Sequence, residues 1–310
     1  MSLKATLFRV LPERAIDVLR RVERSAAIRR VQRAPALSEE RFRLLLQEEL
    51  GVRKGDVVFF HSSIDRLHLA FPFYRVLGLL LETIGEDGTL LCPTYASPSS
   101  SKYLMSGQVF DVRKTPSAMG ILTELMRRHR GAVRSLHPTK SVCAIGPAAR
   151  DLVGSHHLSP CPYDANSPYF RIMAYDAKII GLGVKTKNLA FVHTVDDALK
   201  DAFPVEPYAP TVYDAVCIDE RGERVIVKTL SHEASRMDHD IPSFMKRHVP
   251  PADAEDLTIN GMHFFRVRAR TLFDRMCELA PRGTTLYSDT VYRKPASRQP
   301  PSPRPAVSGT

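Results

Sequence analysis

Short apolar runs alternate with helical patterns through the first half of the chain. Residues 56–60 (DVVFF) form an apolar run of strand length, and residues 89–92 (TLLC) form a second one. Between them, the spacing of apolar positions over residues 76–84 predicts a helix that ends at Gly85. Since strands that are almost entirely apolar are typical of sheets covered on both faces, this order predicts a layered α/β fold. In such a fold the loops at the strand ends carry the chemistry.

The same criteria predict the remaining elements. Ser38 caps a helix that stops at Gly51, and further helices are expected at residues 118–129 and 267–279. Strands are expected at 141–145 and 178–182, and the turn at 219–222 predicts a hairpin of 212–218 with 223–229. Residues 97–108 are small and polar, which indicates a long flexible loop. We see no internal repeat.

Both ends of the chain differ from its middle. In residues 1–36, apolar positions recur at helical spacing while arginines fill the other faces, which predicts a basic amphipathic helix. Such a helix either lies on an anionic membrane surface or packs on its own domain or on a partner chain. The sequence therefore also allows an oligomer. Residues 37–292 then form the main domain. Residues 293–310 are rich in Pro, Ser and Arg, and we expect a disordered tail.

Composition narrows the class of protein. The chain has 310 residues, of which 44% are hydrophobic, so it can bury a substantial core. No run approaches the roughly 18 apolar residues of a membrane span, and no secretory signal is evident. We therefore expect a cytoplasmic protein, in contact with the inner membrane surface if residues 1–36 bind lipid.

The net charge of +10 does not indicate a nucleic-acid partner. Residues 1–36 contribute +6 and residues 293–310 contribute +4, so the main domain is formally neutral. A basic groove within that domain is therefore not expected.

Five scattered cysteines point to free thiols in a reducing compartment. Cys143 lies six residues after His137, so a catalytic thiol is conceivable, but cysteine side chains are usually buried in folded proteins. Two other polar groups invite a metal interpretation: His156 and His157 with Cys161, and His232 and Glu233 with residues 238–240. Neither has the spacing of a helical zinc site, so we expect no metal.

Familiar nucleotide and hydrolase motifs are missing, which excludes a P-loop, a Rossmann fingerprint and a serine-hydrolase elbow. Polar clusters instead follow strands or precede helices. They are His61, Ser62 and Ser63; Thr115, Pro116, Ser117, Met119 and Gly120; and Arg134, Ser135, His137 and Ser141. Hydroxyls and free backbone N–H groups near an arginine suit a phosphate or the amides of a pantetheine arm.

Taken in order, these motifs resemble the aminoglycoside 3-N-acetyltransferase family. The resemblance rests on GDVVFFHSSI, GTLLCPTY, FDVRKTPSAMG, VRSLHPTKSV, NSPYFRI and IIGLGV, and it covers residues 38–280, with GMHFFRVRARTLFD similar to the family's closing helix. It implies the family's own α/β fold, distinct from Rossmann and P-loop folds. It also implies an acyltransferase domain with acetyl-CoA as the acyl donor, bound by the three polar clusters.

The family's catalytic pair is a His followed three residues later by Glu. Carried over, the pair is His193 and Asp196, with the imidazole as general base toward the acceptor amine. Positions i and i+3 of a helix share a face, so a carboxylate at 196 can orient the ring. For the acceptor we expect contacts from Tyr95, Asp111, Tyr163 and Glu233.

Two departures from the family pattern affect the acceptor. The approach to the His is apolar here (LAFV, residues 189–192) rather than rich in Thr, and the Glu is shortened to Asp. An apolar, weakly acidic pocket holds several ammonium groups poorly, because each needs a carboxylate once desolvated. We therefore expect an amino sugar or related biosynthetic intermediate as acceptor. The alternatives are an aminoglycoside acceptor, a catalytically silent binding protein, and a membrane-associated enzyme of polysaccharide assembly.

Overall fold

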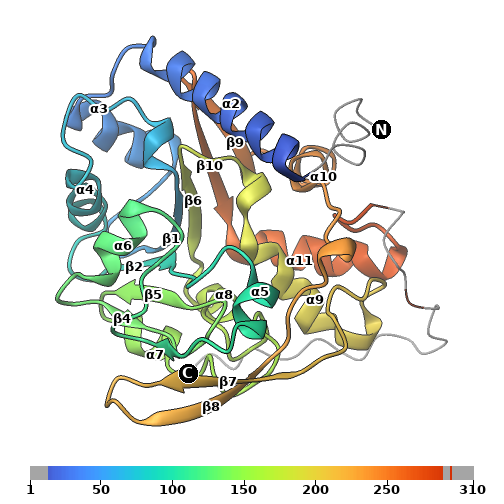
Figure 1. Cartoon of the computed structure of the whole chain (residues 1–310). Helices are drawn as coiled ribbons and strands as arrows, with labels where there is room; N and C mark the ends of the chain where they lie inside the picture. The colour runs from blue at the N-terminus through green and yellow to red at the C-terminus, as the bar shows by residue number, and fades with distance from the viewer. Residues whose placement is uncertain (1–12, 289–293, 295–310) are drawn as a thin grey trace.

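A seven-stranded mixed sheet forms the centre of the molecule (Figure 1). The computed structural model describes residues 13–288 and 294. In the order β4-β5-β2-β1-β6-β10-β9, the central strands β2, β1 and β6 are parallel, and the flanking strands pair antiparallel. The strands, in chain order, are β1 Val57–Ser62, β2 Thr89–Pro93, β4 Val133–Arg134, β5 Val142–Ile145, β6 Lys178–Leu182, β9 Ala254–Ile259 and β10 Met262–Arg268.

Helices cover both faces of this sheet. Successive residues of a strand point to opposite faces, and accordingly Phe59 belongs to one buried apolar core while Val58 and Phe60 belong to the other. The Phe59 side is covered by α7 Ala149–Val153, α8 Pro168–Arg171, α9 Thr194–Leu199, α10 Ile241–His248 and α11 Ala269–Leu279. The other side is covered by α3 Glu39–Leu44, α4 Arg75–Ile84 and α6 Ile121–Arg127. The predicted α/β layered fold is confirmed.

A small second sheet carries the predicted hairpin. Strands β7 Tyr213–Ile218 and β8 Arg224–Thr229 pair antiparallel, and β3 Phe110–Asp111 adds parallel to β7. Phe110, Cys217 and Val227 form its own buried apolar cluster.

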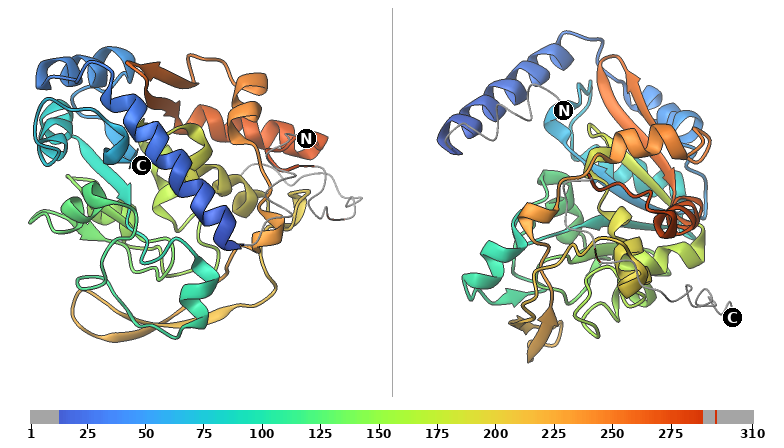
Figure 2. Two further views of the ribbon diagram at one scale, coloured as in Figure 1. Left: turned by 45° about the horizontal axis from the view of Figure 1, so that its top comes forward. Right: turned by 90° about the vertical axis from the view of Figure 1, so that its right-hand side faces the viewer.

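The N-terminal helix α2 Glu13–Gln32 extends along the outside of the molecule (Figure 2). This confirms a helix over that part of residues 1–36, while residues 1–12 lie outside the described residues. Val18, Leu19 and Val22 are exposed, and Val31 is buried in the core. Within the part of the chain that the structure describes, no helix is long and apolar enough to cross a membrane. Of the predicted tail, only Lys294 is described, and its ammonium contacts Glu206.

Four sequence predictions differ from the structure. Residues 97–108 contain a short helix, α5 Ser100–Met105, because Ser99 caps it through the Lys102 N–H. The helix predicted over 118–129 begins only at residue 121, since Gly120 has a φ of 107°. Strand β10 occupies the start of the segment similar to the family's closing helix, so α11 begins at residue 269. Strand β9, antiparallel to β10, was not predicted.

Candidate active site

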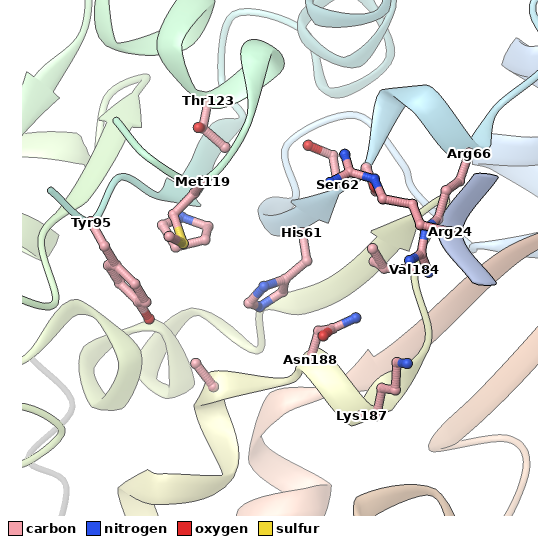
Figure 3. Close-up of a pocket in the computed structure, with 13 residues that line it drawn as sticks. Arg24, His61, Ser62, Arg66, Tyr95, Met119, Thr123, Val184, Lys187 and Asn188 are labelled. Atoms are coloured by element: carbon pink, nitrogen blue, oxygen red, sulfur yellow. The ribbon is translucent and has the colours of Figure 1, made fainter. Parts of the chain in front are cut away.

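An open cavity of about 400 Å³ lies at the ends of the parallel strands (Figure 3). β1 and the helical turn η2 (Ile64–Arg66) supply one wall, and the segment after β6 supplies the other. Loops after β2 and before α6 close it. The lining residues are Arg24, His61, Ser62, Ser63, Arg66, Pro93, Tyr95, Met119, Thr123, Val184, Lys187, Asn188 and Ala190.

The cavity has a cationic end and an apolar end. Figure 3 shows Arg24 and Arg66 beside Ser62, with Lys187 nearby, while Tyr95 and Met119 lie toward the other end and His61 lies between. A groove with cations at one end and apolar side chains at the other suits an elongated ligand that has an anionic head and a less polar arm.

His61 is an unpartnered polar group in this wall. Its Nε2 is buried and has no hydrogen-bond partner among the described residues. Burial lowers the pKa of His61 to about 4, so the ring is neutral at physiological pH. A neutral ring with a free nitrogen can donate to or accept from a bound molecule.

His193 lies one short helical turn from the cavity. It ends the 3₁₀ helix η5 Ala190–His193, whose first residue lines the cavity. Because residues i and i+3 of a 3₁₀ helix eclipse, His193 and Ala190 share one side of η5. His193 itself is 6% exposed and is not among the lining residues.

His193, Asp196 and Tyr287 form one hydrogen-bonded group. The His193 Nδ1 lies 3.0 Å from the Asp196 Oδ2, and the Tyr287 hydroxyl donates to the same oxygen at 2.5 Å. No hydrogen bond engages the Nε2 of His193 within the described residues. The predicted i, i+3 pairing of the ring and the carboxyl is therefore present, while its catalytic role stays a prediction.

Burial acts on both members of this pair. It lowers the pKa of His193 to about 3, with a smaller effect from Lys140, and it raises the pKa of Asp196 to about 8 against the hydrogen bond from Tyr287. The imidazole is thus neutral at pH 7, as a base must be. A free Nε2 lone pair further requires the proton on Nδ1, with Asp196 as the ionised acceptor.

Aromatic rings surround His193. The Tyr163 ring lies 5.3 Å from it and the His232 ring 4.5 Å, measured between centroids, and Tyr163 stacks on His232 at 5.7 Å. Lys140 adds a cation to these surroundings. Burial and then its charge lower the pKa of His193, and burial, His193 and then Lys140 lower the pKa of His232. The Lys140 ammonium lies 4.8 Å from the centroid of the Tyr95 ring.

The structure divides the predicted donor-site residues into two groups. His61, Ser62, Ser63 and Met119 line the cavity. Ser117 instead bonds through its hydroxyl to Thr123 at 2.7 Å, Thr115 accepts from the Asp111 N–H, and Gly120 precedes α6, with Pro116 in the same loop.

The cluster around Arg134 is internal. The Arg134 guanidinium donates to the carbonyl oxygens of Thr115 and Thr94 and to the Ser141 hydroxyl. His137 is fully buried and accepts from the Lys140 N–H, while Ser135 accepts from the Val142 N–H. None of these four residues is in the lining of the cavity, and their contact with CoA stays a prediction.

The four predicted acceptor residues are also separated. Tyr95 lines the cavity and bonds to the Tyr169 hydroxyl at 2.6 Å, and Tyr163 contacts His193. Asp111 accepts the backbone N–H groups of Arg113 and Lys114, so it closes a turn. Glu233 accepts from the Ser235 hydroxyl. These contacts give Asp111 and Glu233 local partners away from the described cavity.

One group of described residues has the composition of a metal site. His193, Asp196 and His232 can each offer one ligand atom, with all three atoms within 4.8 Å of one another. Around His156, where the sequence analysis considered a metal and expected none, both ring nitrogens of His156 have protein partners, the Ser135 hydroxyl and the Pro162 carbonyl. Cys143 is buried in β5, and burial raises the pKa of its thiol, which does not suit a nucleophile.

Comparison with known proteins places this geometry in a family. The family model described as aminoglycoside 3-N-acetyltransferase matches residues 59–279, which is most of the chain. The chain belongs to the aminoglycoside 3-N-acetyltransferase family. The matched region contains β2, β6, most of β1, η5 and the His193–Asp196 pair, but α2 lies outside it.

Curated relatives share part of their length with this chain. Aminoglycoside N(3)-acetyltransferase IX of Micromonospora chalcea is 29% identical over 168 residues, which cover 49% of this chain and 59% of the relative. Aminoglycoside N(3)-acetyltransferase VII of Streptomyces paromomycinus is 31% identical over 168 residues, covering 49% and 58%. The chain thus spans under two thirds of these relatives.

Solved structures of the family have the same fold. A neutron and X-ray structure of sisomicin-bound AAC-VIa superposes with a TM-score of 0.67 at 22% identity, over 81% of this chain and all of that one. AAC-IIIb in binary complex with CoASH superposes with a TM-score of 0.66 at 16% identity, over 80% of this chain and 98% of that one. These likenesses show the family's mixed α/β fold.

Several residues of the site escaped the sequence analysis. Tyr287 and Lys140 lie far from His193 in sequence; Tyr287 belongs to no motif, and Lys140 lies within VRSLHPTKSV but was not singled out. His232 was noticed only as part of a metal cluster. Arg24 was assigned to the amphipathic helix, and only its fold position brings it to the cavity.

Proposed function

We propose that this chain is an acyltransferase that moves an acetyl group from acetyl-CoA to an amine, with His193 as the general base. The observation that carries the proposal is the His193–Asp196 hydrogen bond of 3.0 Å, one 3₁₀ turn from the wall of a cavity with a cationic end. Family membership supports the same activity, since relatives are named aminoglycoside N(3)-acetyltransferases.

We infer that the donor lies along the described cavity. The cationic end of the cavity would receive the phosphates of CoA, and the pantetheine arm would pass His61 toward Ala190, placing the thioester near η5. One solved relative is described as binding CoASH, which supports this choice of donor.

Each proton has a place in the proposed reaction. The Nε2 of His193 takes a proton from the acceptor ammonium, and the free amine then attacks the thioester carbonyl carbon. A C–N bond forms and the C–S bond breaks, and the sulfur leaves as CoA thiol with the proton that the newly acylated nitrogen loses. The proton held on Nε2 then passes to solvent. Asp196 and Tyr287 hold Nδ1 so that the ring faces the reacting amine and its developing charge is balanced.

For the acceptor we propose a single amine on an amino sugar or a related intermediate. The rings of Tyr163 and His232 border His193, and Lys140 adds a positive charge nearby. Desolvating several ammonium groups beside that charge is unfavourable. Because the repulsion grows with the number of ammonium groups, it disfavours a polycation more than a monoamine.

An aminoglycoside is the second candidate acceptor. It is favoured by the names of the relatives and by a solved relative described as bound to sisomicin. Contact of residues 1–36 with a membrane surface, an oligomeric assembly and a cytoplasmic location stay predictions.

Thiol release from acetyl-CoA, measured over a panel of amines, tests the proposal. Wild-type protein should release CoA thiol only when an acceptor is present, with one acetamide formed per thiol. A mono-amino sugar should be used with a higher kcat/KM than a polyamino aminoglycoside. Thiol release with no amine in the panel, together with no CoA binding, would favour the silent binding protein.

A further inference from the structure

Helix α2 contributes a cation to the cavity from outside the family domain. Arg24 lies on α2, whereas the family match begins at residue 59. Even so, Arg24 lines the cavity, and Figure 3 shows its guanidinium next to Arg66 and Ser62. Two parts of the chain that are distant in sequence therefore meet at the cationic end.

A salt bridge orients the Arg24 side chain. Its Nε and Nη2 donate to the Asp65 Oδ2 at 2.9 and 2.7 Å, and the Ser63 hydroxyl donates to the other oxygen of Asp65 at 2.5 Å. No hydrogen bond from the Nη1 of Arg24 is found within the described residues. The side chain is thus held by one edge, and its remaining donors are left to a ligand.

Arg66 supplies the second, independent sign of a ligand. Its Nε is buried and has no hydrogen-bond partner within the described part of the chain. Other atoms of the Arg66 side chain line the cavity, and within the described residues no hydrogen bond or ion pair of this side chain is found. Its donors that face the cavity are therefore left to a ligand.

The charges at this end do not balance. The residues that line the cavity include Arg24, Arg66 and Lys187 but no Asp or Glu, and within the described part of the chain Arg24 forms a salt bridge with Asp65. A bound phosphate group would offset the excess, and guanidinium groups bind phosphate through paired N–H donors. An exposed ion pair alone contributes little to stability, so anchoring α2 is a weak explanation of the arrangement.

We propose that Arg24 binds a phosphate of the acyl donor together with Arg66, so that α2 completes the donor site. This inference rests on the proposed function, because it assumes CoA as the donor. The two sources of phosphate in CoA, the 3′-phosphate and the diphosphate, share the same chemistry and are separated by the ligands below.

Calorimetry on the full chain tests the inference with CoA, dephospho-CoA and pantetheine. Arg24→Gln should bind CoA about tenfold more weakly than wild type and bind pantetheine, which has no phosphate, equally well. If the loss appears with CoA but not dephospho-CoA, Arg24 contacts the 3′-phosphate; a loss with both assigns it to the diphosphate. Arg21→Gln, an exposed change on the same helix, is the matched control and should bind CoA like wild type.

Asp65→Asn separates a phosphate contact from a structural role. It removes the negative charge beside the proposed phosphate but keeps an amide oxygen that can accept from Arg24 and hold its orientation, so CoA should bind at least as tightly as to wild type. Equal weakening by Asp65→Asn and Arg24→Gln would overturn the inference, as would unchanged CoA affinity in Arg24→Gln. Arg24→Lys provides a folded, charge-retaining variant that should lose less affinity than Gln. A wild-type protein that binds pantetheine and CoA with the same affinity also overturns it, whereas binding of neither ligand defeats the proposed function itself.

Discussion

Replacing Asp196 by Asn should remove most of the catalytic power of His193 while leaving the fold intact. The Asp196 Oδ2 is the group that faces Nδ1, at 3.0 Å, and it also accepts from Tyr287. An Asn amide can donate to Nδ1, which forces the ring proton onto Nε2 and removes the lone pair that the amine needs. In the other amide orientation the geometry survives, but no negative charge balances the imidazolium.

The size of the loss follows from the role of the base. A positioned general base supplies ~10²- to 10⁴-fold in rate, so kcat should fall by that range. This corresponds to about 3 to 5 kcal/mol of transition-state stabilisation. The affinity for CoA should not change, because Asp196 is buried and is not a lining residue of the cavity.

The assay is thiol release at saturating acetyl-CoA and acceptor across pH 6 to 10. Burial raises the pKa of Asp196 to about 8, and the ionised carboxylate is the active form, so wild-type kcat should rise with pH through about 8. In Asp196→Asn that rise should vanish. Asp197→Asn is the matched control, since the neighbouring carboxyl accepts the Tyr163 N–H and an amide oxygen can do the same. A kcat for Asp196→Asn within threefold of wild type would refute the reasoning.

Three further changes probe the site. Tyr287→Phe removes a hydrogen bond that lowers the pKa of Asp196, so the rise of kcat should move to higher pH with the same acceptor; an unchanged profile contradicts this. Lys140→Met removes the cation near His193, so kcat/KM for a polyamino acceptor should increase several-fold relative to a monoamine, and an unchanged ratio would show that Lys140 does not select the acceptor. Gly183→Ala should raise KM for acetyl-CoA and lower the free energy of unfolding by about 1 to 3 kcal/mol. The reason is that Gly183 has a φ of +74° and that a new Cβ would lie 2.3 Å from the Ser63 carbonyl oxygen. A wild-type free energy of unfolding, measured by denaturant titration, would contradict this prediction.

Local patterns in the sequence predicted the parts of the fold that depend on burial. The runs at β1, β2 and β6 are apolar because both faces of the sheet are covered, and each was placed within two residues. β9 was missed because it is partly exposed and its sequence, AEDLTI, carries two acids. The start of α11 was misplaced since the apolar positions of β10 continue directly into it.

In the site, too, the sequence predicted contacts between residues close in the chain and not contacts between distant ones. The pairing of His193 with Asp196 depends on a separation of three residues, so sequence could predict it. Tyr287 reaches Asp196 across 91 residues, and Arg24 reaches Asp65 across 41, so only the fold brings them together. For Arg134 the sequence could not show that its guanidinium donates to the carbonyl oxygens of Thr115 and Thr94, because these partners lie 19 and 40 residues away.

The proposed removal of the amine proton by His193 is tested by His193→Ala. Acetyl transfer and CoA affinity should be measured on the same preparation, with His129→Ala, an exposed change, as control. We expect His193→Ala to lose transfer by at least about a hundredfold and to keep wild-type CoA affinity. Wild-type turnover in His193→Ala would show that another group takes the proton.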